Sequence, residues 1–193
     1  MIAYFKLGDW WGEAFSDEER SLIESIYQPM GGGSLTSGDI QSTSNTDVAF
    51  LQTLAGWFQK KEYRHIATKC LQKSQSLVDE STRPLDFHFL LSNQVSTLYK
   101  DRNDSPNGLE KAIAACEQQI EFAVDAKAAF EKEYKGHSLP SHVGFRQLAI
   151  VLEKQKKYED AITLVKKAKS QGWSGDWDKR IERCLKKLHS FQR

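Results

Sequence analysis

The sequence predicts an all-α protein built of antiparallel helical hairpins and closed by a C-terminal capping helix. From residue 45 onward, apolar residues recur at three- and four-residue steps, which is the period of an amphipathic helix and not of a strand. Short polar turns separate these periodic segments, as in αα-hairpins. With 193 residues, the chain is long enough to bury such a core without disulfide or metal cross-links.

Composition excludes several classes of protein. The chain is 39% hydrophobic and 11% aromatic, which is too apolar for a disordered chain. No apolar run approaches the roughly 18 residues that cross a membrane. Its first residues do not have the pattern of a signal peptide or a lipidation motif. Cys70, Cys116 and Cys184 are widely spaced on predicted apolar stripes, so we expect buried, reduced thiols in a cytoplasmic protein.

Charge is distributed unevenly along the chain, although the net charge is only +1. Residues 1–60 carry 3 basic and 8 acidic groups, whereas residues 146–193 carry 13 basic and 6 acidic groups. A dedicated nucleic-acid binder usually has a clearly basic domain. We therefore favour a solvated helix face or head-to-tail self-association over a nucleic-acid footprint.

The N-terminal part predicts an arm, a helix and a linker. Residues 1–15 are aromatic and show no regular period, and Trp10 and Trp11 form an aromatic anchor that either folds back on the helical body or docks elsewhere. Ser16 and Glu19 form a capping box that begins a short helix, which completes the arm at residues 1–30. Residues 31–46 are rich in Gly, Ser and Thr and predict a flexible linker. The remaining residues, 47–193, form the helical domain.

Three hairpins and a last helix follow in the helical domain. The first hairpin has stripes over 48–58 and 63–78, and the second begins with a helix at Pro84, a residue suited to a first helical turn. Its partner is predicted as a single helix from Leu109 to Tyr134, about 39 Å long at 1.5 Å per residue. The third hairpin pairs a helix capped by Ser141 with a helix that ends at Gly172. A last amphipathic helix with a charged outer face carries Trp177 to Phe191 and suits the open end of a repeat array.

The third hairpin resembles a tetratricopeptide repeat (TPR) over about 34 residues. Large and small residues alternate at the spacing of that family, with Ala149 and Ala161 where the helices cross closely. Lys156 stands in the turn where the family usually has Gly, and Gly172 stands where Pro is common. The whole 46–190 region is similar to uncharacterised bacterial TPR-like proteins. The large residues and the remaining small residues of the pattern are Phe145, Leu148, Leu152, Tyr158, Val165 and Ala168.

The TPR resemblance implies a short right-handed solenoid that binds a protein or peptide in its concave groove. On the third hairpin the groove residues are expected to be Arg146, Ile150, Glu153 and Lys154. Arg146 and Lys154 could together bind an acidic segment or a C-terminal carboxylate. On the second hairpin, the groove candidates are Ser92 and Ser96.

Other chemistry is disfavoured by the sequence. His137 and His142 flank a short loop, but no third ligand at metal-binding spacing accompanies them, so we expect a solvated loop and no metal. No nucleophile motif occurs, and we predict a protein without enzymatic activity or cofactor. Trp173 and Trp177 either lock the last helix onto the array or form a contact surface, since Trp is enriched at binding hot spots.

Two alternative functions stay open at this stage. One is nucleic-acid binding through the basic last helix, in which Lys179, Arg180, Arg183 and Lys186 would contact phosphates. The other is a homo-oligomeric structural protein, in which the acidic 1–60 segment of one copy meets the basic C-terminal segment of another.

Overall fold

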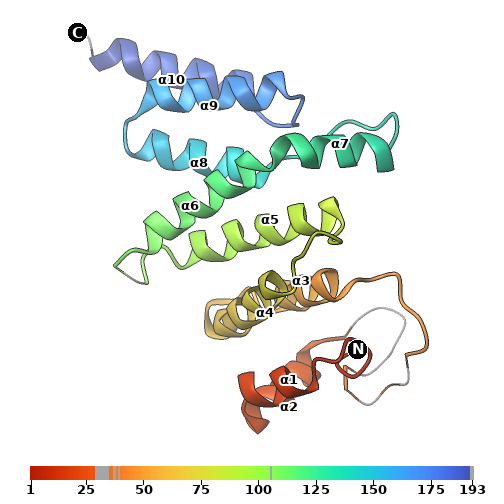
Figure 1. Ribbon diagram of the computed structural model, residues 1–193. Helices are drawn as coiled ribbons and strands as arrows, with labels where there is room; N and C mark the ends of the chain where they lie inside the picture. Colours follow the sequence, from red (N-terminus) through yellow and green to blue (C-terminus); the bar gives the residue numbers. More distant parts are fainter. Residues whose placement is uncertain (29–34, 37, 39, 105, 192–193) are drawn as a thin grey trace. The chain divides into compact units, whose positions relative to one another are not determined.

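A computed structural model describes the chain except residues 29–34, 37, 39, 105 and 192–193. The described residues form ten α-helices and one short 3-10 helix, and they contain no strand beyond an isolated bridge between Ser141 and Ser174 (Figure 1). This confirms the predicted all-α class. No described helix is both long and apolar enough to cross a membrane. The chain divides into two compact units, Met1–Ser81 and Thr82–Arg193.

The first unit combines the N-terminal arm with the first hairpin. Val48 and Leu51 of the first hairpin helix and Ile66 of the second are buried, as their periodicity predicts. Of the predicted linker, residues 31–34, 37 and 39 lie outside the described residues, while Leu35 is buried and its carbonyl accepts from the Ile2 N–H. The helices are α1 (Gly8–Ala14), α2 (Asp17–Ile26), α3 (Asp47–Trp57), η1 (Lys61–Tyr63) and α4 (Arg64–Ser76).

The prediction that residues 1–15 have no regular structure is wrong in part, because Gly8–Ala14 form α1. The capping box at Ser16 is confirmed at the start of α2. The arm packs on the hairpin of its own unit: the Phe5 ring stacks on the Phe50 ring at 5.5 Å. The Lys69 ammonium of α4 donates to the Ala14 carbonyl at 2.7 Å. The arm was expected either to fold back on the helical body or to dock elsewhere, and it packs on the first hairpin of its own chain.

The second unit is a series of helices that pack mainly on their neighbours in the chain. Contacts join α5 to α6, α6 to α8, α8 to α9 and α9 to α10, and α7 also lies on α5. The TPR-like positions Phe145, Ala149, Ala161 and Val165 are all fully buried. The helices are α5 (Pro84–Lys100), α6 (Gly108–Glu121), α7 (Ala123–Glu133), α8 (Val143–Lys154), α9 (Tyr158–Ser170) and α10 (Trp177–Phe191).

The prediction of one helix from Leu109 to Tyr134 is wrong, because the chain breaks at Phe122 into α6 and α7. The Phe122 ring packs edge-on against the Phe87 ring of α5, with centroids 4.8 Å apart. The break turns α7 away from the direction of α6 (Figure 1) and allows α7 to lie on α5. No Gly or Pro marks the break, so the periodic pattern carries no signal for it.

Helices α8 and α9 end in the same way, with one residue in the left-handed conformation. Lys156 has φ +60° and Gly172 has φ +88°. After α8, the Lys157 N–H donates to the Leu152 carbonyl and the Lys156 N–H to the Glu153 carbonyl, which is the Schellman motif. Glycine adopts this conformation without steric cost, whereas other L-residues bring Cβ too close to the following carbonyl. The Lys in the place of the TPR glycine is therefore a strained position.

Replacing Lys156 with Gly is expected to raise the free energy of unfolding by about 1 kcal/mol, because it removes that steric cost. Gln155→Gly is the matched control: Gln155 has φ −79° and ψ 2°, so glycine there adds chain entropy to the unfolded state and relieves no strain. Urea denaturation of both variants checks the prediction, which fails if Lys156→Gly is no more stable than the wild type.

Candidate functional site

A hollow lies between the N-terminal part of α5 and α7, and it has a volume of about 660 Å³. That volume lies in the range of about 300–1,000 Å³ that is typical of ligand pockets. The apolar part of its lining comes from both helices and from the break between α6 and α7. These apolar lining residues are Pro84, Leu85, Phe122, Ala128 and Ala129.

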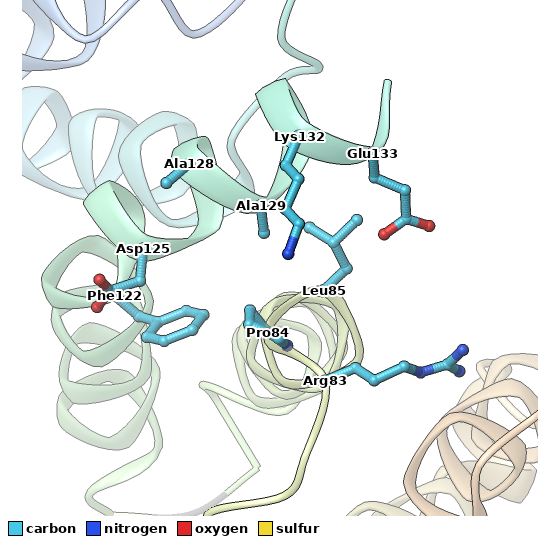
Figure 2. A pocket seen from close by; sticks show the side chains of 9 residues that line it. All are labelled: Arg83, Pro84, Leu85, Phe122, Asp125, Ala128, Ala129, Lys132 and Glu133. Carbon is cyan, nitrogen blue, oxygen red and sulfur yellow. The ribbon is translucent and has the colours of Figure 1, made fainter. Parts of the chain in front are cut away.

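Four charged side chains belong to the same lining: Arg83, Asp125, Lys132 and Glu133. Figure 2 shows the Lys132 side chain reaching from α7 toward Pro84 and Leu85 of α5. The Arg83 guanidinium is bound to Asp86 by two hydrogen bonds of 2.8 and 3.2 Å. The hollow therefore offers an apolar surface beside charges of both signs, which can fix the orientation of a bound group.

No sequence pattern predicts this hollow, because the hollow depends on the break at Phe122. In a single straight helix, Ala128, Ala129 and Lys132 would follow the direction of α6. The bend places them on α5 instead. Among the predicted groove residues, none lines this hollow.

The predicted groove residues of the third hairpin divide into two kinds. Arg146 is exposed and Ile150 is half-buried on α8. The Glu153 carboxylate is instead bound to Arg180 and Arg183 of α10, and the Arg183 Nε lies 2.9 Å from its Oε2. The Lys154 ammonium donates to the Tyr99 hydroxyl at 3.1 Å. Two of the four side chains thus already have partners within the unit.

The predicted serines of the second hairpin are half-buried on α5. The Ser96 hydroxyl donates to the Ser92 carbonyl at 3.0 Å, one helical turn earlier. This bond directs the Ser96 hydroxyl to its own helix, so Ser92 offers the freer hydroxyl of the two for a ligand in a groove.

The four predicted aromatic anchors differ in exposure. Trp173 and Trp177 are 2% and 4% exposed and belong to the core of the second unit. The Trp177 indole N–H donates to the Trp173 carbonyl, which agrees with the interpretation that they lock the last helix in place. Trp11 is buried and Trp10 half-buried in the first unit, with both rings against Phe15.

The expectation that His142 lies in a solvated loop is wrong, because its side chain is fully buried. His142, not Ser141, is the N-cap of α8, and its Nδ1 accepts from the Phe145 N–H at 3.4 Å. Its ring lies 5.4 Å from the ring of His88, which is also buried, and the Trp173 ring stacks on His88. His142 is buried by packing against residues that are distant in the sequence, and local composition does not predict such contacts.

Burial controls the ionisation of this histidine pair. Loss of hydration lowers the pKa of His88 to about 4. Burial also lowers the pKa of His142 to about 3, assisted by the neighbouring His88 and opposed by the backbone of Gln119. Both rings are therefore neutral at physiological pH. Within the described part of the chain, no group of three or more His, Cys, Asp or Glu side chains is arranged to hold a metal ion.

The start of α8 approaches α6 closely beside this pair. The buried Gly144 N–H donates to the side-chain oxygen of Gln119 at 2.7 Å. A Cβ atom on Gly144 would lie 2.9 Å from the Cys116 carbonyl oxygen. The contact between α6 and α8 therefore requires glycine at this position.

Most of the α10 cations that would contact nucleic acid are already paired with carboxylates of the same unit. Arg180 is only 6% exposed and binds Glu153, and Arg183 binds the same carboxylate. Lys186 forms an ion pair of 2.6 Å with Glu182. Of the four cations that the nucleic-acid alternative invoked, only Lys179 is exposed without an ion pair to a described residue.

The chain matches no family model, and no solved structure matches it. It is 25% identical over 171 residues to an uncharacterized protein of Aquifex aeolicus (strain VF5), which covers 86% of this chain and 78% of that protein.

Proposed function

We propose that this chain is a non-enzymatic protein- or peptide-binding adaptor and that its second unit is a TPR-like helical array. The observation that carries the proposal is the hollow between α5 and α7, with its apolar lining and charged rim. The order of helix packing in the second unit and the buried small residues Ala149 and Ala161 support the TPR-like arrangement.

A peptide is the ligand that suits this hollow best. An apolar side chain of the peptide would displace water from Phe122 and Leu85, which supplies binding free energy in proportion to the area buried. Charged and polar groups beside that side chain would pair with Asp125, Lys132 and Glu133, which favours one orientation and one sequence over others. The exposed Arg146 and half-buried Ile150 on α8 are the predicted groove residues that can still contact a partner.

We place this function in the cytoplasm, because the three cysteines are free and buried. Burial raises the pKa of the Cys70 and Cys116 thiols to about 12, so neither is a reactive thiolate at neutral pH. Their role is that of small apolar residues in the core.

Capture of partners from native cytosol tests the proposal. Ala128 is an exposed lining residue, so Ala128→Arg fills the hollow without disturbing the core. The matched control is Ala114→Arg, at an alanine of α6 that is also exposed but does not line the hollow. We expect a protein that the wild type and the control capture and that Ala128→Arg loses by about tenfold or more, since one lost contact of about 1.4 kcal/mol has that effect.

A second variant, Arg146→Ala with Lys154→Ala, tests the groove that the TPR resemblance implies. Loss of the partner in this variant alone would place binding on α8 and away from the hollow. Capture that all variants retain, or no captured protein at all, would contradict the proposal.

A further inference from the structure

A second hollow, with a volume of about 270 Å³, is lined by residues of α5, of the C-terminal end of α7 and of the loop at residues 137–140. This volume is below the range of about 300–1,000 Å³ that drug-sized ligands occupy, so the hollow suits a small group. We call it the aromatic hollow, because Phe89, Phe130 and Tyr134 belong to its lining. Among the described residues that line it, none is Lys, Arg, Asp or Glu.

The three rings of the aromatic hollow touch one another. The Phe130 ring is 8% exposed and lies deepest, whereas Phe89 is 43% and Tyr134 is 48% exposed. The Phe89 ring is perpendicular to the Phe130 ring, with centroids 5.9 Å apart. The Tyr134 ring is tilted by 38° from the Phe130 ring, with centroids 6.0 Å apart. Two large exposed rings beside one hollow mark a binding surface, whereas single scattered apolar side chains do not.

Hydrogen bonds to the segment after α9 hold the loop side of the hollow in place. The Ser174 N–H donates to the Pro140 carbonyl at 3.2 Å, and the Ser174 hydroxyl donates to the Leu139 carbonyl. Leu139 is 9% exposed and belongs to the core of the second unit. The hollow is therefore formed before a ligand enters, which lowers the entropic cost of binding.

The chemistry of this lining suits a cation that has no hydrogen-bond donors. The face of an aromatic ring carries partial negative charge and attracts a cation within about 6 Å of the ring centroid. A primary ammonium would bring three N–H donors to a lining without a carboxylate. A trimethylammonium group has no such donor and presents methyl groups to the rings. The side chains of His137 and Ser138, which also line the hollow, have no hydrogen bond to a described residue and can bind a hydroxyl group of the ligand.

We propose that the aromatic hollow binds the trimethylammonium group of a small quaternary amine such as choline. The charged neighbours of Tyr134 in the sequence, Glu133 and Lys135, do not line this hollow, and their opposite charges offset each other. The attraction therefore comes from the rings. This site differs from the α5–α7 hollow and does not depend on the proposed peptide binding.

Titration of the full chain with choline, followed by nuclear magnetic resonance, tests the proposal. We expect saturable shifts of the backbone amide signals of Tyr134, His137 and Ser138. The neutral carbon analogue of choline, in which a tert-butyl group replaces the trimethylammonium group, has nearly the same shape without the charge. Choline should bind about tenfold or more tightly than this analogue, because only the cation is attracted by the ring faces.

Two substitutions each remove one exposed ring and keep an apolar side chain. Phe89→Leu and Tyr134→Leu should each weaken choline binding by about fivefold, whereas Tyr134→Phe keeps the ring and should bind as the wild type does. Tyr4→Leu is the matched control, because Tyr4 is 42% exposed in the first unit and does not line the hollow. Circular dichroism verifies that each variant is folded.

Three results of these titrations would overturn the proposal. The first is the absence of saturable shifts at about 10 mM choline, a concentration that nearly fills a site with a dissociation constant of about 1 mM. The second is equal binding of choline and its neutral analogue, which would assign the hollow to apolar groups in general. The third is wild-type affinity in both leucine variants, which would place choline elsewhere on the chain.

Two further probes carry the same trimethylammonium group on a larger molecule. These are a peptide with a trimethylated lysine and vesicles of phosphatidylcholine. Free choline should compete with either probe at the hollow. Binding of one of them at the hollow, without binding of free choline, would overturn the proposal of a small ligand and assign the site to a modified protein or to a lipid surface.

Discussion

As the pH falls from about 8 to about 5, the second unit is expected to lose about 2 kcal/mol of stability for each of its two buried histidines. The unfolded chain binds a proton at His88 and at His142 near pH 6.5. The folded chain does not bind them until the pH reaches about 4 for His88 and about 3 for His142. Protons are therefore taken up on unfolding throughout this interval, and stability decreases with acidification. At about pH 8 both states are neutral at these rings, and the effect disappears.

Two substitutions separate this effect from the titration of other groups. His88→Phe keeps an aromatic ring against Trp173, and His142→Asn keeps an oxygen that can cap α8. Each variant should lose less stability than the wild type between about pH 8 and about pH 5, by about 2 kcal/mol. The difference between variant and wild type cancels the contribution of all groups that both share.

Amide hydrogen exchange in α5 and α8, measured by mass spectrometry, reports the opening of this unit separately from the first unit. Protection that falls with pH equally in the wild type and both variants would show that the histidines do not control acid stability. At about pH 8, the variants should differ from the wild type only through packing, which serves as the internal reference.

The features that were predicted correctly from the sequence are those that depend on residues close together in the chain. Periodicity located the stripes of α3, α4, α5, α8 and α9, and the Ser16 capping box located the start of α2. These features depend on residues three or four apart, whose geometry a helix fixes. The Schellman ends at Lys156 and Gly172 also fall at the turns that the third hairpin required.

What the sequence did not predict depends on contacts between distant residues. His142 is buried against the ring of His88 on α5 and the ring of Trp173 after α9, and the Glu153 carboxylate binds an arginine 27 residues further along. The α5–α7 hollow depends on the packing of Phe122 on Phe87, which are 35 residues apart. No local pattern specifies which of many charged or aromatic residues will meet in this way.

Removal of the Glu153 carboxylate is expected to have the largest effect on stability of any single substitution considered for this chain. Arg180 is 6% exposed, and its guanidinium binds Glu153, while Asp176 lies 3.8 Å away at the surface. Glu153→Ala leaves this buried cation without its main partner. Such a change costs about 3 kcal/mol, because the buried charge has lost its hydration and keeps only the more distant, half-exposed Asp176 carboxylate as an opposite charge.

The control is Glu182→Ala, which removes another carboxylate from an ion pair of α10, in this case with Lys186 at the exposed surface. Surface pairs of this kind contribute little, since water solvates both ions when they separate. Urea denaturation of the two variants should therefore show a large loss for Glu153→Ala and little change for Glu182→Ala. Equal stability of the two would mean that Arg180 stays solvated in the fold and that Glu153 is free to meet a partner. A large difference assigns Glu153 to the attachment of α10, which places it outside the binding surface that the TPR resemblance implied.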